Sequence, residues 1–435
     1  MKIAILGGGL SGLTSAFFLS KKNRHEIALF EKEPILGGMA SGFRSKNWQW
    51  HLEKTYHHFF SNDSDILDLM ADTGFNDIFF QKPESVSLYD IPGCKPSGQV
   101  NYRTFTVDTP QDFLRFPLLS LPDKLRSGMI IAFLKLSPFF SFYERSTAED
   151  FLKKSMGDTS WNILWEELFR KKFGKYAENV VAAFFWARIK KRTKKLGYIS
   201  GGFQRFIDHL GKRLERESVI INKNVVVERI SSKGGKFEIR IKNKPVEIFD
   251  AIISTLPTPV LMKVGEGMFA DSYIDRLKKI KYLHGTNLII ETKKPFFDKA
   301  YWVNVNVKEF PFMALVQHTN FIDKKNYGGN NLLYVGNYVD GNNRLLKMSS
   351  KQTLDFYYPF LKKINGSYGI ESAKTYLFSS YFAQPVFDRS FLDNRPGFET
   401  PIDKLFIANL DMTYPYDRGT NYAVAIGRQV VSKYF

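Results

Sequence analysis

The residues with the clearest chemical meaning lie near the N-terminus. Gly7, Gly9 and Gly12 form the spacing Gly-x-Gly-x-x-Gly. In a strand-turn-helix, the first glycine permits a tight turn, the second lets the backbone approach a pyrophosphate, and the third lets the helix pack close to the strand. Glu31 follows about 20 residues later, where an acidic side chain accepts the ribose hydroxyls of a dinucleotide. These residues predict a dinucleotide-binding site.

A second group of reactive side chains lies between Trp48 and Phe60. Three of the seven histidines, His51, His57 and His58, fall in this stretch. Because imidazole has a pKa near neutrality, His57 or His58 is a candidate proton donor. Alternate side chains on an extended segment face opposite ways, so we expect at most one of the pair at a reacting group; the alternative is a histidine packed under a cofactor and bonded to backbone. The pair lacks the third ligand and the spacing of a zinc site, so no metal is predicted.

Three short elements must position the glycines and Glu31. Lys2–Leu6 and Glu26–Phe30 are apolar runs typical of buried strands, and Leu13–Leu19 has the composition of a helix. Leu10 and Ser11 lie at the start of that helix, where free N–H groups face bound phosphates. The same apolar stretch could pass for a signal peptide, but its glycines would weaken a hydrophobic helix.

The segment after Glu31 indicates which dinucleotide is bound. It contains Lys32, Gly37, Gly38, Met39 and Ala40. A second glycine pair at this place resembles the flavoprotein superfamily of amine oxidases, protoporphyrinogen oxidases, phytoene desaturases and UDP-galactopyranose mutases. The resemblance implies that these residues lie close to an FAD. Many members have arginine after the glycines, so Met39 leaves phosphate neutralisation to Arg44 or to the backbone.

Later segments extend the resemblance to the whole chain. A glycine pair at Gly201 and Gly202 precedes an amphipathic helix, and Gly234–Gly235 is typical of a hairpin turn. In relatives, the valine strand that contains Val226 contacts the adenine through its backbone. Relatives also use a C-terminal strand, loop and helix to hold the flavin ribityl chain. Their candidate cofactor residues here are Asn409, Asp411, Gly419, Thr420 and Asn421.

The resemblance also suggests which residues surround the flavin ring. Arg418 would stabilise the reduced ring near N1 and O2, and Tyr414 or Tyr416 would wall the substrate. The alternative is a solvent-exposed loop with its tyrosines packed on the domain. Amine oxidases place a lysine ahead of a Lys-x-Pro-Phe-aromatic element, where it holds a water near N5. The corresponding position here is Asn287, so the oxidation of a simple amine is less expected.

The order of these segments predicts an α/β fold in two interleaved domains. A Rossmann-like FAD-binding domain comprises residues 1–60, 196–280 and 396–435. Residues 61–195 and 281–395 form an α+β substrate-binding domain, with an antiparallel sheet and a helical cap. The flavin ring is expected at the seam between the two domains.

Length and composition agree with a folded protein of several units. The chain has 435 residues, 44% of them hydrophobic. Its single cysteine, Cys94, cannot form an internal disulfide, so a reducing, cytoplasmic compartment is predicted. The C-terminal motif has no cysteine, and FAD is therefore expected to bind noncovalently. The most apolar run, Met129–Phe140, is interrupted by Lys135 and Pro138 and is too short to span a membrane.

The strong positive charge has several interpretations. The formal net charge is +18. Six bases fall within residues 188–195, directly after the apolar stretch Val180–Ala187. Such a region could lie on the inner face of an anionic membrane, could bind a diphosphate, or could be a solvated loop next to a core helix. No nucleic-acid-binding fold is recognised, so nucleic acid is not an expected partner.

These features together predict an FAD-dependent oxidoreductase. A hydride would pass from a C–H or C–N bond of a hydrophobic or sugar-containing small molecule to flavin N5. The substrate would be lipid-like or a nucleotide sugar. The first alternative is a non-redox isomerase of the UDP-galactopyranose mutase type. The second is an inactive flavoprotein that serves as a binding subunit.

Overall fold

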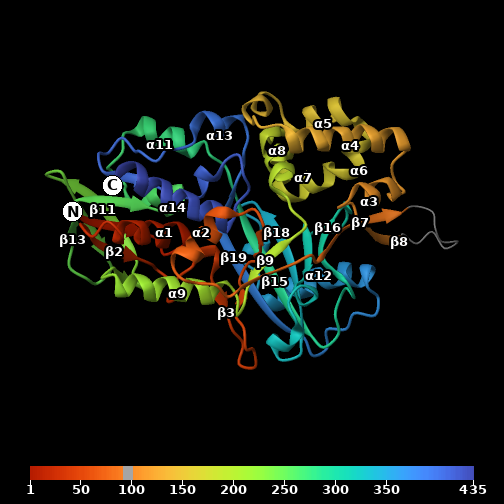
Figure 1. The fold of residues 1–435 in the computed structure, drawn as a ribbon, viewed down its shortest axis with the longest axis horizontal. Helices are drawn as coiled ribbons and strands as arrows, with labels where there is room; N and C mark the ends of the chain where they lie inside the picture. Colours follow the sequence, from red (N-terminus) through yellow and green to blue (C-terminus); the bar gives the residue numbers. More distant parts are fainter. Residues whose placement is uncertain (92–100) are drawn as a thin grey trace.

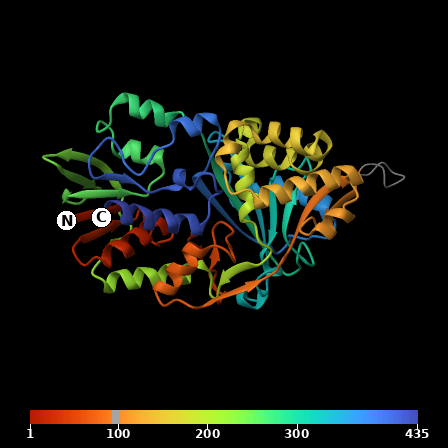
Figure 2. The same cartoon turned by 45° about the horizontal axis from the view of Figure 1, so that its top comes forward.

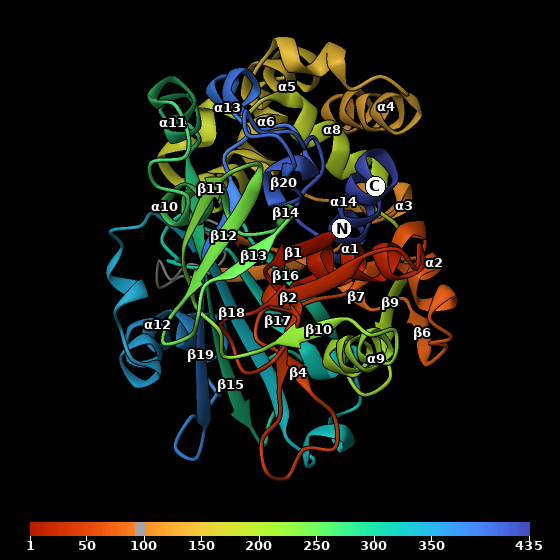
Figure 3. The ribbon, with the colours of Figure 1, turned by 90° about the vertical axis from the view of Figure 1, so that its left-hand side faces the viewer.

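The structure, a computed structural model, describes residues 1–91 and 101–435, and Cys94 lies outside the described residues. Two lobes lie side by side in Figure 1. The first contains both termini and a parallel sheet, and the second contains a larger sheet covered by helices. Figure 3, which shows the first lobe from its outer end, places the two termini close together.

Five parallel strands form the sheet of the first lobe. Their order is β10 (Ile220–Asn222), β2 (Glu26–Phe30), β1 (Lys2–Leu6), β14 (Ala251–Ser254) and β20 (Leu405–Ile407). Ile3 of the central strand pairs with Ile27 on one side and Ala251 on the other. These strands are short apolar runs because both faces of a parallel sheet are covered. The covering helices include α1 (Leu10–Ser20), α9 (Phe203–Arg216) and α14 (Thr420–Tyr434).

A small antiparallel sheet stands beside the parallel one. It consists of β11 (Val227–Lys233), β12 (Lys236–Ile241) and β13 (Glu247–Phe249). Gly234 and Gly235 join the first two strands with φ angles of +59° and +76°, which confirms the predicted hairpin turn. Val226 lies one residue before β11, and its carbonyl accepts a hydrogen bond from the Lys242 N–H.

The second lobe contains a sheet of seven strands. Their order is β19 (Lys374–Pro385), β15 (Tyr282–Thr292), β18 (Asn331–Val339), β17 (Ala314–Gln317), β16 (Ala300–Val305), β7 (Glu84–Ile91) and β8 (Asn101–Phe105). All neighbours are antiparallel except β7 and β16. This parallel pair joins two stretches of chain that are far apart in the sequence.

Helices cover one side of this sheet and form the cap. The cap comprises α3 (Pro110–Arg115), α4 (Leu121–Leu136), α5 (Ala148–Met156), α6 (Asp158–Leu164), α7 (Glu166–Phe173) and α8 (Ala182–Lys191). Figure 2 shows these orange and yellow helices as one group beside the first lobe. A parallel sheet with helices, next to an antiparallel sheet with a helical cap, confirms the predicted fold class.

Shorter elements connect the two lobes. The strands β5 (Phe59–Phe60), β9 (Leu196–Ile199) and β6 (Ile78–Gln81) form one small sheet, and β3 (Gly42–Phe43) pairs with β4 (Leu52–Glu53). The histidine segment therefore runs from β4 to β5, between two pairings that fix its ends. The remaining helices are α2 (Ser64–Asp72), α10 (Thr258–Val264), α11 (Asp271–Lys278), α12 (Ser350–Ile364) and α13 (Arg389–Asn394).

The burial of the cap corrects one interpretation of the basic region. Val180–Ala187 was a candidate for contact with a membrane, but every residue of this stretch is buried, with Phe184 only 1% exposed. These side chains belong to the largest hydrophobic core. Within the described ranges, no helix has both the length and the apolar character needed to cross a membrane.

Candidate functional site

The glycines after β1 make the close approaches that their spacing predicts. Gly7 has a φ of +104°, a conformation that side chains rarely adopt. A Cβ on Gly12 would lie 2.1 Å from the Gly7 carbonyl oxygen. Gly9 differs from both, because the nearest atom to an added Cβ is the Gly38 Cα, 3.9 Å away. The glycine at position 9 is therefore not required by the packing of the protein itself.

The second glycine pair packs directly on the first loop. The Gly37 N–H donates to the Gly8 carbonyl at 2.8 Å. Gly37 and Gly38 have φ angles of +118° and +56°, and a Cβ on Gly38 would lie 3.2 Å from the Gly9 Cα. Residues 7–9 and 37–38 thus form a surface of bare backbone, which we call the glycine cradle. Met39 is half-buried and packs against the main core, whereas Ala40 is fully buried.

The first turns of α1 and α14 leave backbone N–H groups free. Neither α1 nor α14 has a capping side chain or an acidic residue in its first turn. The helices cross closely, since a Cβ on Gly427 would lie 2.4 Å from the Ser11 carbonyl oxygen. The Ser11 hydroxyl donates to the Ala408 carbonyl at 2.6 Å, so Ser11 offers a ligand only its N–H. Uncapped N–H groups and the helix dipole favour a bound phosphate.

Glu31 is held in place by backbone donors. Its carboxylate accepts the Gly8 N–H at 2.7 Å and the Glu33 N–H at 2.9 Å. A carboxylate has about four lone-pair sites, so two remain for ribose hydroxyls. Lys32 points its ammonium toward Glu33, 3.6 Å away, and its side chain is 72% exposed. The backbone cradle, the uncapped α1 and Glu31 fit the diphosphate and ribose of FAD.

The predicted C-terminal cofactor residues bond mainly to protein. The Asn409 amide donates to the Leu256 carbonyl at 2.8 Å, and its oxygen caps the following turn. The Asp411 carboxylate accepts from Thr258 and, at 2.7 Å, from the Tyr282 hydroxyl. Burial raises the pKa of Asp411 to about 6, against the effect of these two donors.

The start of α14 is tied to a neighbouring helix. The Asn421 side-chain oxygen accepts the Ile66 N–H at 3.1 Å, and its amide donates to Asp65 at 3.2 Å. Asn421 therefore anchors α2. Gly419 is the residue before the helix and Thr420 its buried first residue, so these two present backbone N–H groups rather than side chains.

His57 has a defined tautomer. Its Nδ1 lies 2.6 Å from the Thr55 carbonyl oxygen. Because a carbonyl can only accept, Nδ1 carries the proton and Nε2 keeps a free lone pair. Desolvation, followed by the positive charge of Arg418, lowers the pKa of His57 to about 3. At neutral pH this ring is therefore uncharged and carries its single proton on Nδ1.

His58 faces a different set of partners, as expected for adjacent residues on an extended segment. Its Nδ1 lies 3.1 Å from the Tyr301 hydroxyl, and its ring contacts Trp302 edge-on with centroids 6.0 Å apart. Desolvation, with a smaller effect of Arg192, lowers the pKa of His58 to about 4. His57 instead contacts Phe203, at the start of α9.

A charged cluster joins the C-terminal tail to the cap. The Asp417 carboxylate pairs with Lys172 of α7 at 2.7 Å and with Arg188 of α8. Arg418 donates through Nε to the hydroxyl of Tyr338 on β18. Burial alone would raise the pKa of Asp417, but Lys172 and Arg188 hold it below its ordinary value. We call Lys172, Arg188, Asp417, Arg418 and Tyr338 the seam cluster.

Lys172 is a largely enclosed cation of the seam cluster. Its side chain is 11% exposed, and burial lowers its pKa to about 8 although Asp417 opposes the shift. The ammonium lies 5.1 Å from the centre of the Tyr338 ring. Three cations facing one carboxylate leave this part of the seam positively charged.

Tyr414 is not part of this arrangement. Its ring packs against Phe140, Phe387 and Phe391, and Arg395 lies 4.8 Å from the ring centre. Among the described residues, no ring contact or hydrogen bond joins Tyr414 to the histidines or to Arg418. Tyr416, the other candidate for the substrate wall, lies nearer to the basic run. Its ring stacks on Tyr422 with centroids 4.7 Å apart, and the Lys191 ammonium lies over it.

Sequence reasoning missed one buried acid, Glu53. Its side chain is completely buried and accepts the Phe203 N–H at 2.8 Å and the Tyr198 hydroxyl at 2.7 Å. Burial raises the pKa of Glu53 to about 7, although both donors oppose the shift. A single acid in a polar segment gives no sequence signal of this role, because its partners are about 150 residues away.

Asn287 lies close to the histidine segment. It is buried in β15, and its amide donates to the Thr55 hydroxyl at 3.1 Å. The Thr55 carbonyl is the acceptor of His57. The position at which the family comparison expects a lysine in amine oxidases is therefore occupied here by an uncharged side chain that positions the histidine segment.

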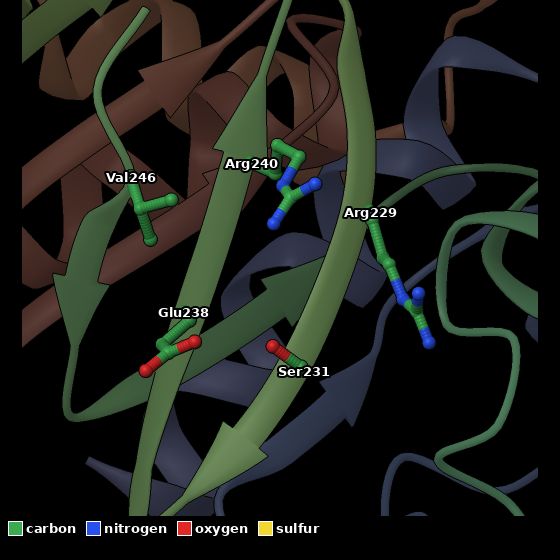
Figure 4. A pocket seen from close by; sticks show the side chains of 5 residues that line it. All are labelled: Arg229, Ser231, Glu238, Arg240 and Val246. Carbon is green, nitrogen blue, oxygen red and sulfur yellow. The ribbon is translucent and has the colours of Figure 1, made fainter.

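An open hollow lies elsewhere, on the small antiparallel sheet. Figure 4 shows Arg229 and Ser231 on β11 beside Glu238 and Arg240 on β12, with Val246 at the rim. None of the predicted site residues lines it. The functional argument therefore rests on the glycine cradle and the seam cluster.

Comparison with known proteins agrees with this geometry. The family model described as flavin containing amine oxidoreductase matches residues 10–430. Coproporphyrinogen III oxidase of Staphylococcus aureus is 24% identical over 294 residues, which cover 60% of this chain. The match spans 61% of that enzyme, which is less than two thirds of its length.

Solved structures share the fold over nearly the whole chain. A protein from Exiguobacterium sp. 255-15, described as a protoporphyrinogen oxidase, has a TM-score of 0.74 and 17% identity, and the match covers 99% of this chain and 98% of that one. A reduced UDP-galactopyranose mutase has a TM-score of 0.73 and 14% identity, with 99% and 93% covered. At these identities the likeness concerns the fold.

Proposed function

The chain belongs to the family of flavin-containing amine oxidoreductases, and on that basis we propose that it binds FAD noncovalently and oxidises a hydrophobic or sugar-containing substrate. The observation that carries the proposal is the glycine cradle, where backbone alone lines the surface between uncapped α1 and Glu31. When bound, FAD supplies a two-electron acceptor that takes a hydride from a C–H or C–N bond at N5.

His57 is proposed to accept a proton during the oxidation. Loss of a hydride from carbon next to an O–H or N–H group also releases a proton. The free Nε2 of His57 can take that proton, because Nδ1–H is committed to the Thr55 carbonyl. Asn287 supports the arrangement by holding the Thr55 side chain. Proton transfer to a positioned side chain typically contributes a factor of about 10² to 10⁴ to the rate.

The seam cluster supports a substrate with an acidic group. Lys172, Arg188 and Arg418 outnumber Asp417, and Lys172 is almost enclosed. A carboxylate or phosphate next to Lys172 would favour its charged form and form charge-assisted hydrogen bonds. The aromatic rings of Tyr338, Tyr416 and Trp186 suit an apolar or sugar ring beside that acidic group.

Asn287 supports oxidation of a C–H bond over oxidation of a simple amine. A neutral amide that is already bonded to Thr55 does not supply the cation that amine oxidases place there. The substrate of the curated relative, coproporphyrinogen III, is a carboxylated tetrapyrrole that combines apolar and acidic parts. A substrate of this class fits both the aromatic and the cationic side chains of the seam.

A second candidate function is the isomerisation of a nucleotide sugar by reduced enzyme. The seam cluster would also suit a diphosphate, and a UDP-galactopyranose mutase is a structural neighbour. This reaction involves no net oxidation, and in an enzyme of the mutase type it would need FAD that is already reduced, which the reaction itself does not supply.

An anaerobic assay separates the two functions. Oxidised, FAD-loaded enzyme is mixed with coproporphyrinogen III, phytoene, putrescine or UDP-galactopyranose, and flavin absorbance is followed. The proposal expects bleaching of the flavin by an acidic, apolar substrate without added reductant. Turnover that occurs only with prereduced enzyme and a nucleotide sugar would establish the second function instead.

A further inference from the structure

Helix α4 carries a row of large apolar side chains that remain exposed among residues 1–91 and 101–435. The row repeats every three or four residues along the helix, so its members share one face. Each of the five is more than half exposed, from 54% for Leu125 to 79% for Leu136. We call this row the α4 stripe, and it consists of Leu121, Leu125, Met129, Phe133 and Leu136.

The stripe is not the core-facing side of the helix. The opposite side of α4 contains Ser127 and Leu134, both buried, and Ile130 and Ile131 pack partly against the main core. The helix is therefore apolar on both sides, although only one side has a partner. Such a helix is normally buried, so a free apolar side indicates a missing partner.

The exposed apolar surface continues beyond the helix. Leu114, Phe139 and Phe142 are 50%, 72% and 59% exposed. Of the fourteen large hydrophobic side chains that are exposed in the described part of the chain, eight lie between residues 114 and 142. Contiguous apolar surface of this kind marks an interaction site, whereas single exposed residues do not.

Basic residues surround the stripe. The segment from Leu114 to Arg145 contains Arg115, Lys124, Arg126, Lys135 and Arg145, against the two acids Asp123 and Glu144. The helix is thus apolar on its free face and cationic around it. This combination of an amphipathic surface with Lys and Arg at its borders is that of helices that lie in a membrane interface.

The basic run at residues 188–195 is anchored to the end of the stripe. The Lys135 ammonium donates to the Ile189, Lys190 and Arg192 carbonyls at 2.7 to 3.1 Å. In return, the Lys190 ammonium donates to the Lys135 carbonyl at 2.8 Å. The two lysines therefore cap each other's helices, which fixes the basic run beside Leu136.

We propose that the α4 stripe docks the protein on an anionic lipid bilayer. The stripe would lie in the interface between headgroups and acyl chains, and the surrounding bases would contact lipid phosphates. A second copy of the chain is a poorer occupant, because it carries the same charge of +18. Figure 3 shows α4 at the periphery of the cap.

The α4 stripe lies near the proposed active site, but the docking proposal does not depend on the proposed activity. Helix α8 ends against Lys135, and the same helix contributes Arg188 to the seam cluster. The docked protein would hold the seam near the bilayer, where an apolar substrate can be taken from lipid. Membrane docking can hold even if the oxidation proposal fails, because its test needs no turnover.

Vesicle sedimentation tests the proposal directly. FAD-loaded protein is centrifuged with phosphatidylcholine vesicles, or with vesicles that also contain phosphatidylglycerol, at low and high salt. We expect sedimentation with the anionic vesicles only, and less of it at high salt. The triple variant Leu125→Ser/Met129→Ser/Phe133→Ser should lower the bound fraction about tenfold.

A matched control distinguishes the effect of the α4 stripe from that of exposed apolar side chains elsewhere on the protein. Ile220 and Ile248 are 61% and 52% exposed on the first lobe. The double variant Ile220→Ser/Ile248→Ser should bind like the wild type. Thermal midpoint and flavin spectrum report folding of each variant.

Three outcomes would overturn the proposal. They are failure of the wild type to sediment with anionic vesicles, equal sedimentation with neutral vesicles, and a dimer in gel filtration that the triple variant abolishes. The last would assign the stripe to a second copy of the chain.

Discussion

The structure defines the tautomer and the protonation state of His57, which the sequence leaves open. A histidine beside a flavin-type site can donate or accept a proton, and the sequence does not choose. The low pKa of about 3 keeps the ring neutral, and the bond from Nδ1 to the Thr55 carbonyl leaves Nε2 unprotonated, so Nε2 can accept a proton but has none to donate. Its neighbour His58 is directed to Tyr301 instead, so the two histidines are not interchangeable.

Replacing His57 by asparagine tests this role. The new amide can still donate to Thr55, but no group replaces Nε2. We expect flavin reduction by the substrate to slow by about 100-fold, with FAD binding unchanged. Stopped-flow absorbance measures the rate, and His58→Asn is the matched control with a smaller effect.

The protonation state of the His57 imidazole can be measured without a substrate. Nitrogen NMR of protein labelled in histidine should show His57 as the neutral Nδ1–H tautomer at pH 5.5, since its pKa lies near 3. His57→Asn identifies the signal by removing it. A cationic ring at that pH, or an unchanged reduction rate in the variant, would contradict the assigned role.

At the scale of elements, Glu53 links three parts of the chain. Its side chain bonds to the start of α9 and to Tyr198 of β9, and its carbonyl accepts the Tyr334 hydroxyl from β18 at 2.7 Å. The residue lies on β4, at the beginning of the histidine segment. The protonation state of Glu53 therefore affects how firmly that segment is held between the lobes.

Glu53 gives the protein a specific dependence of stability on pH. The pKa of Glu53 is about 7 in the folded protein, above its ordinary value of 4.5. The folded state thus binds more protons between these values, so the free energy of unfolding falls as pH rises from about 4.5 through about 7. The loss amounts to about 3 kcal/mol at most.

The variant Glu53→Gln should remove this loss, because glutamine resembles the protonated acid. Calorimetric melting of both proteins at pH 5 and pH 8 is the measurement. We expect the variant to gain stability over the wild type as pH rises. Glu215→Gln, at an exposed position on α9, serves as the control. A variant that loses stability equally at both pH values would show that the carboxylate itself is required.

At the scale of the whole molecule, the sequence predicted local elements better than distant contacts. The parallel sheet followed from apolar runs and glycine spacing, which are local signals. The seam cluster did not, because Lys172 and Asp417 are separated by 245 positions. Apolar stretches were also ambiguous: Val180–Ala187 is core, whereas the equally apolar stripe on α4 is exposed. Composition records hydrophobicity, but only packing decides which face is covered.

The glycines of the cofactor site are of two kinds, those that the fold requires and one that only a ligand requires. Gly7 and Gly12 are required by the fold, since a φ of +104° and a 2.1 Å approach exclude side chains there. Gly9 is different, because an added Cβ would have 3.9 Å to its nearest protein atom. A glycine at position 9 is therefore needed only by a ligand that approaches the backbone at that point.

FAD binding by the variant Gly9→Val tests the central claim most directly. Titration calorimetry with FAD is compared among the apo forms of the wild type, Gly9→Val and Gly397→Val, an exposed glycine with open space around it. We expect Gly9→Val to melt like the wild type without FAD but to bind FAD at least about 100-fold more weakly, while Gly397→Val binds normally. Wild-type affinity in Gly9→Val would contradict the placement of FAD in the glycine cradle.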